Sequence, residues 1–467
     1  MSLKSLANET WIQILEFLRL DCLDHSSLLQ PPQSDTDFID VQRMGLDADA
    51  YANLARVART SKLFQTFAEP ILYRTLLLTE FEDPGRIHRM VEALIHSPYR
   101  RDLVKVLFLC PRADSELSRD WALSFGAAFS SLGLPSPIPQ GIAINFSIQR
   151  DCYEDAINAF CLALTPKLRR LYIRVSQCQF LVPAVLQSSL ENNQSRFHAL
   201  KELWLLPEPP MGLYATLTWV QNFDYIFGLP SLTSLHAIRF GWCGFQWMIR
   251  PTNHSITRIH LEGADVSLVE LESLFLQCRG LRDLYLDIMI DDDASLSGQS
   301  SFSCDELGNI FRSCTNLESL MLSFRPTSKS DNDKIAGKLS SRIGNLQDLK
   351  SLRSLSMKLH VFSGFADTKI SDLPPNYEPI QKSDRGPLRL TEILPDSLER
   401  LLLQPQRIGL DEDDMFLEVR DVLTCKRLSH ICCVQVPPNM KRPKAERISG
   451  WEFSQETLSY TRLKSET

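Results

Sequence analysis

The feature that most constrains this fold is a short pattern, L-x-x-L-x-L, that recurs from about residue 100 onward. Each copy predicts a strand with two or three apolar side chains on one face, because successive residues of a strand point to opposite faces. Clear copies begin at residues 168, 200, 256, 281, 317 and 398, and weaker ones at 103, 232, 352 and 428. The period of 24 to 36 residues between 168 and 317 indicates one supersecondary unit per copy.

Amphipathic segments precede two of these strands and predict a helix in each unit. Each segment ends at a cysteine that lies three residues before the first leucine of the strand, Cys278 and Cys314, and Cys425 follows the same phase more loosely. A small apolar thiol suits a buried structural position. The pattern resembles leucine-rich repeats, which implies a solenoid with a parallel sheet on its concave face and helices on its convex face. We expect an irregular array, because the spacing fails between 103 and 168 and again around 360–397.

Two apolar stretches near the N-terminus, residues 6–18 and 54–74, predict short helices that enclose a polar insert at about 20–50. In the first stretch, Trp11, Ile14, Leu15 and Leu18 form a single helical stripe. In the second, Pro70 is expected to end or restart the helix, since it lacks an N–H. Helices this short bury little by themselves. They either pack on the rest of the chain or dock a partner.

These two stretches resemble an F-box, in a form common among fungal members of that family. The opening pattern matches at Leu6, Glu9, Ile14, Leu15 and Leu18, and the later one at Ser61, Lys62, Phe64, Ala68, Glu69, Pro70, Leu72, Tyr73 and Arg74. The sequence departs from the family at Ala7, where proline is usual, and in the length of the insert. A polar surface loop adds little closure cost with length. The alternative is a helical cap on the repeats.

The resemblance implies a substrate-recognition subunit of a Skp–cullin–F-box type ubiquitin ligase. The F-box would bind a Skp-type adaptor, and through it the cullin, while the repeats would hold a target protein. The implied adaptor contacts are apolar, and they are Leu6, Ile14, Leu15, Leu18, Val57, Leu63 and Phe64. The predicted organisation is a helical domain at 1–78, a repeat domain at 79–436 and a tail at 437–467. In that tail, Trp451 and Phe453 are expected to pack back onto the last repeat.

Residues between the leucines are expected on the face of the sheet opposite the core, where a target protein would bind. Aromatic residues on such a face resemble interface anchors. The candidate substrate contacts are Arg170, Tyr172, Arg174, Trp204, His260, Asp283, Tyr285 and Asp287. The alternative, left open by the sequence, is that long loops fold over this face and bury these side chains.

Composition and motifs point away from several other classes. The formal charge of −7 and the pI near 5.8 argue against a nucleic-acid partner. The sequence predicts no membrane span and no signal peptide, so we expect a cytoplasmic or nuclear protein whose 12 cysteines are reduced. No nucleotide, zinc or hydrolase motif occurs, so no catalytic residue, metal or cofactor is expected. His236 and His260 are assigned to an exposed strand face.

Two alternatives of other classes remain open at this point. The first is an interaction or scaffold protein whose N-terminal helices only cap the solenoid. The second is an enzyme or enzyme inhibitor built on a repeat scaffold, for which the sequence contains no supporting motif.

Overall fold

The computed structural model describes residues 8–18, 48–78, 84–109, 155, 157–175, 181–191, 197–206, 218–219, 224–241, 255–290, 304–326, 343–358, 390–404, 412–436, 448, 450–454 and 458–463. Leu6, most of the polar insert and the irregular spacings after 109 and after 358 lie outside these ranges. The chain divides into two compact units, Met1–Thr216 and Leu217–Thr467, and each is described by itself.

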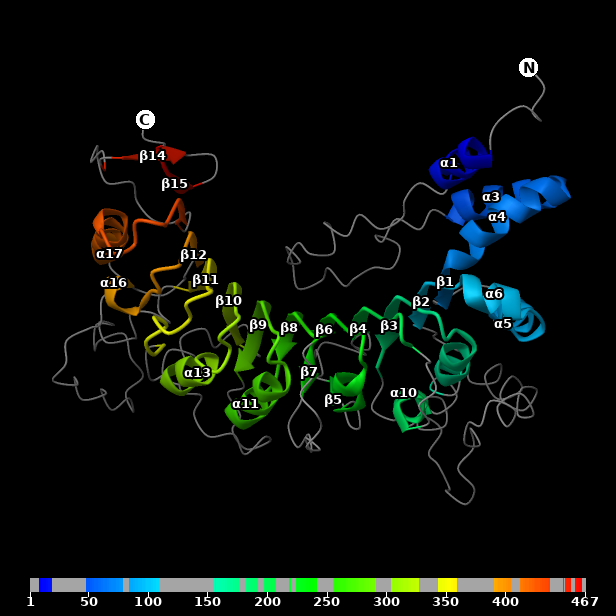
Figure 1. Ribbon diagram of the computed structural model, residues 1–467, viewed down its shortest axis with the longest axis horizontal. Coiled ribbons are helices and arrows are strands. Elements are labelled where there is room, and N and C mark those ends of the chain that lie inside the picture. The colour runs from blue at the N-terminus through cyan, green and yellow to red at the C-terminus, as the bar shows by residue number, and fades with distance from the viewer. Residues whose placement is uncertain are drawn as a thin grey trace. The chain divides into compact units, whose positions relative to one another are not determined.

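The first unit begins with a helical module, defined as α1 (Asn8–Leu18), α3 (Ala48–Thr60) and α4 (Lys62–Arg74) (Figure 1). Ser61 caps α4, because its side-chain oxygen accepts a hydrogen bond of 3.2 Å from the Phe64 N–H. The prediction that Pro70 ends or restarts this helix is wrong, since α4 runs through Pro70 to Arg74. Proline removes one internal hydrogen bond there. Ala68 and Ile71 flank it and are buried in the module's core, which holds both parts of the helix in line.

Helix α4 runs directly into the first strand of a parallel sheet. The strands of the first unit are β1 (Thr75–Leu78), β2 (Val106–Leu109), β3 (Arg170–Arg174) and β4 (Glu202–Leu206), and they pair in that order. It also contains α5 (Pro84–His96), α6 (Pro98–Leu103) and α10 (Leu181–Glu191), and a further helical stretch over residues 157–164. The sheet therefore begins at Thr75, before the end of the helical domain predicted at 1–78.

The second unit continues the same plan with more strands. Its parallel strands, in spatial order, are β6 (Ser234–Ile238), β8 (Arg258–Ala264), β9 (Asp283–Ile290), β10 (Ser319–Pro326), β11 (Ser354–Lys358), β12 (Arg400–Gln404) and β13 (Cys433–Gln435). Its helices are α11 (Leu268–Gln277), α13 (Cys304–Phe311), α16 (Leu390–Ile393), α17 (Glu412–Thr424) and the 3₁₀ helix η2 (Asp224–Gly228). A separate pair, β5 (Thr218–Trp219) and β7 (Phe240–Gly241), is also parallel. Helices α11 and α13 lie along the same side of β8, β9 and β10 in Figure 1.

Every L-x-x-L-x-L segment identified in the sequence contributes a strand, so the predicted mixed α/β fold with a mostly parallel sheet is confirmed. The leucines form the core face, where Leu284, Leu286, Leu320 and Leu322 are at most 2% exposed. Helices cover this face, and Phe275 of α11 approaches Phe311 of α13 with ring centroids 5.8 Å apart.

The cysteines that lie three residues before the first leucine of a strand belong to a tight turn. The Cys278 carbonyl accepts a hydrogen bond of 3.0 Å from the Leu281 N–H, and the Cys314 carbonyl accepts one of 3.0 Å from the Leu317 N–H. Both cysteines are buried, and burial raises the pKa of each thiol to about 12. They therefore stay protonated and serve as small apolar groups.

A repeated backbone bond sets the register between neighbouring strands. The N–H groups of Arg169 and Arg170 both donate to the Lys105 carbonyl, at 2.8 and 3.0 Å. Those of Lys201 and Glu202 both donate to the Arg169 carbonyl, at 2.9 and 3.2 Å. The same arrangement recurs through the second unit. It places in a row the residue that lies two positions before the first buried apolar residue of each strand, and we call this the leading row.

The tail reverses direction and finishes the sheet of the second unit. Strand β15 (Ser459–Arg462) pairs antiparallel with β13, and β14 (Trp451–Ser454) pairs antiparallel with β15. The Trp451 indole N–H donates to the Leu423 carbonyl at 3.0 Å, and the Arg462 guanidinium lies over the indole ring, 4.9 Å from its centroid. Trp451 therefore packs back onto α17, which belongs to the last repeat, as the sequence predicted.

Candidate interaction surfaces

The helical module has a small core and an apolar surface beside it. Leu15, Leu54, Ala68 and Ile71 are at most 5% exposed and pack together. Outside this core, the Trp11 and Phe64 rings meet edge to face with centroids 5.0 Å apart.

The sequence neighbours of that aromatic pair are open to solvent. Ile12 is 38% exposed and Leu63 is 51% exposed. Trp11, Ile12, Leu63 and Phe64 are called the apolar patch below. Large apolar side chains that stay exposed on a folded surface are typical of a protein interaction site.

The predicted adaptor contacts separate into distinct environments. Leu63 and Phe64 lie in the apolar patch, Val57 is half-buried against the module's core, and Leu15 is inside that core. Ile14 and Leu18 lie on α1, and Leu6 and the side chains of Ile14 and Leu18 fall outside the described residues. Leu15 is thus placed to hold the helices together, which the helical stripe alone does not reveal.

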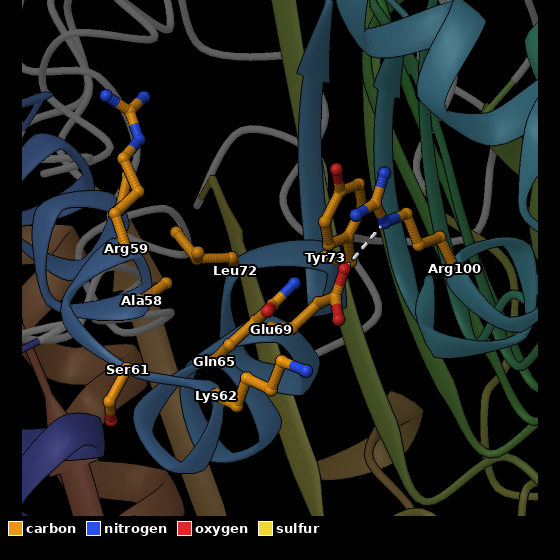
Figure 2. Close-up of a pocket in the computed structure, with 10 residues that line it drawn as sticks. Ala58, Arg59, Ser61, Lys62, Gln65, Glu69, Leu72, Tyr73 and Arg100 are labelled. Atoms are coloured by element: carbon orange, nitrogen blue, oxygen red, sulfur yellow. Dashed lines mark hydrogen bonds and ion pairs between the residues drawn. The ribbon is translucent and has the colours of Figure 1, made fainter.

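A pocket of about 450 Å³ is lined by α3, α4 and Arg100 of α6 (Figure 2). Arg100 of α6 donates to the Glu69 carboxylate of α4 at 2.6 Å, and its guanidinium lies 5.1 Å from the centre of the Tyr73 ring. Burial raises the pKa of Tyr73, which Arg100 partly counteracts. This pair fastens α4 to α6, so the module and the start of the sheet are held as one piece.

The outward face, defined as the sheet face opposite the leucines, carries a column of aromatic rings in the first unit. Phe108 and Tyr172 stack with centroids 4.1 Å apart and planes 7° from parallel, and Tyr172 lies 5.6 Å from Trp204. All three are at most 3% exposed. Burial raises the pKa of Tyr172, and its hydroxyl has no hydrogen-bond partner among the described residues.

The outward face of the second unit has a more open column. His260 stacks on Tyr285 with centroids 3.9 Å apart and planes 3° from parallel, and both are partly exposed. His236 lies beside His260 at 5.4 Å but is only 2% exposed, so the assignment of His236 to an exposed face is wrong. Burial, His260 and Arg258 lower the pKa of His236 to about 3, and its Nε2 lies 2.8 Å from the Ser234 hydroxyl. His236 is therefore neutral at neutral pH.

The predicted substrate contacts fall into three groups. Arg170, Arg174, His260, Asp283 and Tyr285 are partly exposed, and Arg170 and Asp283 form ion pairs with Glu202 at 3.0 Å and Arg258 at 3.6 Å. Tyr172 and Trp204 are buried in the first aromatic column. Asp287 is fully buried and accepts a hydrogen bond of 3.3 Å from the Gly263 N–H. For these last three, the burial that the sequence left open is what the structure has.

Two features of these surfaces were missed by sequence reasoning. Phe108 belongs to the first aromatic column, whereas the weak copy that begins at residue 103 assigned it to the leucine face; that register is wrong by one residue, because Leu107 pairs with Leu171 and Phe108 with Tyr172. The second missed feature is the charge along the leading row. It becomes visible only when the register between neighbouring strands is known.

Neither a metal-binding cluster nor a membrane-spanning helix is found among the described residues. Among the described residues, no group of three or more His, Cys, Asp or Glu side chains is placed to hold a metal ion. Within the same ranges, no helix combines the length and the apolar character that crossing a membrane requires. No model of a known protein family matches this chain, and no curated protein matches it significantly.

Proposed function

We propose that this chain is the substrate-recognition subunit of a Skp–cullin–F-box type ubiquitin ligase. In this proposal the helical module is an F-box, and the strand–helix units form a leucine-rich-repeat solenoid that holds the target protein. The chain would hold the target protein near the ubiquitin-charged partner. The rate of ubiquitin transfer would rise because the effective concentration of the target there is raised.

The observation that carries this proposal is the apolar patch. The module already has a core of its own in Leu15, Leu54, Ala68 and Ile71, yet it leaves Ile12 and Leu63 open beside the Trp11–Phe64 pair. A helical surface of this kind fits recognition of a partner by apolar anchors in a groove. The F-box resemblance indicates that the partner is a Skp-type adaptor.

Co-purification of the full chain with a Skp-type adaptor tests the proposal, with Leu63→Asp as the decisive variant. Leu63 is 51% exposed, so the charge should leave the module folded while removing an apolar contact. Leu276→Asp is the matched control, since Leu276 is a 48% exposed leucine on α11. We expect a stoichiometric complex from the wild type and the control on a sizing column, and none from Leu63→Asp.

Leu15→Asp is a poor substitute for this variant. It would bury a charge in the module's core, and loss of binding would then report unfolding. Retention of the adaptor by folded Leu63→Asp would overturn the assignment of the apolar patch as the docking surface.

A second candidate function is an interaction scaffold in which the helical module caps the sheet. The continuity of α4 with β1 and the Glu69–Arg100 pair favour it. Deleting residues 1–80 does not separate the two functions, because the deletion also removes β1 and exposes the edge of β2. Failure of the folded wild-type chain to bind any Skp-type adaptor would favour the cap.

A further inference from the structure

The leading row of the first unit is occupied by cations only. Its members are Arg74, Lys105, Arg169 and Lys201, one at each of four successive strands. The Lys105 N–H donates to the Arg74 carbonyl at 2.9 Å, and the shared bonds to the Lys105 and Arg169 carbonyls continue the series. Backbone pairing therefore sets these four residues side by side, at steps of about 4.8 Å.

Within this row, the charge of Arg169 acts unfavourably on that of Lys105. Partial burial lowers the pKa of Lys105, and the charges of Arg169 and of the nearby Lys167 lower it further. Asp102 counteracts this, since its carboxylate lies 2.7 Å from the Lys167 ammonium and its carbonyl accepts a hydrogen bond from Lys105 at 2.7 Å. Such a row gains from a negatively charged partner, because the partner relieves the repulsion between its members.

The corresponding row in the second unit neutralises itself. Arg282 forms an ion pair with Glu318 at 3.5 Å, and Arg353 forms one with Glu399 at 3.7 Å. The same backbone frame thus carries alternating charges in one unit and a single sign in the other. Strand pairing involves only the backbone and imposes no charge. The positive charge of the first row therefore comes from the side chains at these positions.

We propose that Arg74, Lys105, Arg169 and Lys201 bind an acidic segment of a partner protein, laid across the strands at the start of the sheet. Three steps between four strands span about 14 Å, which matches four to five residues of extended chain. Arg74, Arg169 and Lys201 are exposed, and Lys105 is partly so. A peptide suits the site better than a nucleic acid, since the chain carries a net charge of −7.

This site does not depend on the adaptor interaction, so either proposal can fail without the other. The test uses the full chain and a fluorescently labelled ten-residue polyglutamate peptide, with binding followed by fluorescence anisotropy at low and moderate salt. The variant is Arg169→Glu/Lys201→Glu, and the matched control is Arg282→Glu/Arg353→Glu, which changes the net charge equally at exposed positions of the other row.

We expect the first double variant to lose at least about tenfold in affinity and the control to change by no more than about threefold. Binding by the wild type should weaken as salt is added. Circular dichroism verifies that both variants are folded. If either is not, Arg169→Gln and Arg353→Gln form the milder pair, with the loss again confined to Arg169→Gln.

Equal loss in both double variants would overturn the proposal, because net charge alone would then explain binding. So would absence of wild-type binding at low salt. Tighter binding of a ten-residue oligothymidylate than of the peptide would overturn the assignment of a protein partner.

Discussion

The two units share the same arrangement of parallel strands and helices, but their outward faces carry different side chains. In the first, a buried column of Phe108, Tyr172 and Trp204 lies beside a leading row of cations. In the second, His260 and Tyr285 stack in a partly open column beside a row of paired charges. The leucines of both units form the same kind of core. The residues between them point to the other face of the sheet, so core packing does not determine their identity. The packing of the core and the character of the outward surface are thus encoded at alternate positions of the same strands.

The largest expected contrast is between the two aromatic columns. Tyr172→Ala should destabilise the protein by about 3 to 5 kcal/mol, because it opens a cavity in a buried stack. Tyr285→Ala should cost about 1 kcal/mol or less, since Tyr285 is partly exposed and its removal opens no buried cavity, although the stacking on His260 is lost. Urea unfolding of both variants measures the difference. Similar losses from the two would contradict the distinction between a buried and an open column.

The second largest expected effect is a loss of stability at low pH, caused by His236 beside the column of the second unit. The lowered pKa means that between about pH 6.5 and pH 3 the unfolded chain holds a proton at this position that the native chain lacks. Stability therefore falls as the pH falls below 6.5, by about 2 kcal/mol at pH 5.

The His236 effect is measured as the change in unfolding free energy between pH 7 and pH 5. His236→Gln should reduce that change by about 2 kcal/mol. His198→Gln alters an exposed histidine of the first unit and serves as the control. An identical pH dependence in the wild type and His236→Gln would show that His236 does not carry the acid sensitivity.

Removing one atom tests the buried column more finely. Tyr172→Phe should stabilise the protein by about 1 kcal/mol, because the buried hydroxyl has no hydrogen-bond partner among the described residues. Tyr285→Phe, at a position with partial exposure, should be nearly neutral. Thermal unfolding of the two variants compares them. A destabilised Tyr172→Phe would mean that the hydroxyl is satisfied in solution.

The smallest expected effect has opposite signs in the two leading rows. Arg169→Glu should stabilise by a few tenths of a kcal/mol, since it relieves Lys105, whereas Arg282→Glu should destabilise by a similar amount beside Glu318. Both effects should shrink at high salt. Urea unfolding at low and high salt checks this, and equal signs would remove the difference between the rows.

The frame could be predicted from the sequence because its signal is local. Alternation within six residues identifies a strand, and the cysteines before Leu281 and Leu317 mark the turn that precedes it. Parallel pairing then follows from the repeated helix–strand order.

The surfaces were less accessible to sequence reasoning, because exposure depends on residues far apart in the chain. The stripe of α1 does not reveal that Leu15 points into a core with Leu54 and Ile71. Equally, the alternation that places Tyr172 and Tyr285 on one face does not say which is covered. The prediction of Pro70 as a helix end failed for the same reason, since burial on both sides outweighs one lost hydrogen bond.

The hairpin of β14 and β15 determines which strand forms the edge of the second unit's sheet. Strand β15 runs antiparallel to β13, and β14 runs antiparallel to β15, so the outermost strand β14 again has the direction of the parallel strands. The hairpin thereby pairs the backbone groups of β13 that would otherwise form an open strand edge, and open edges invite pairing with another chain. Loss of the hairpin would therefore expose β13 and make the protein prone to associate with further copies through that strand.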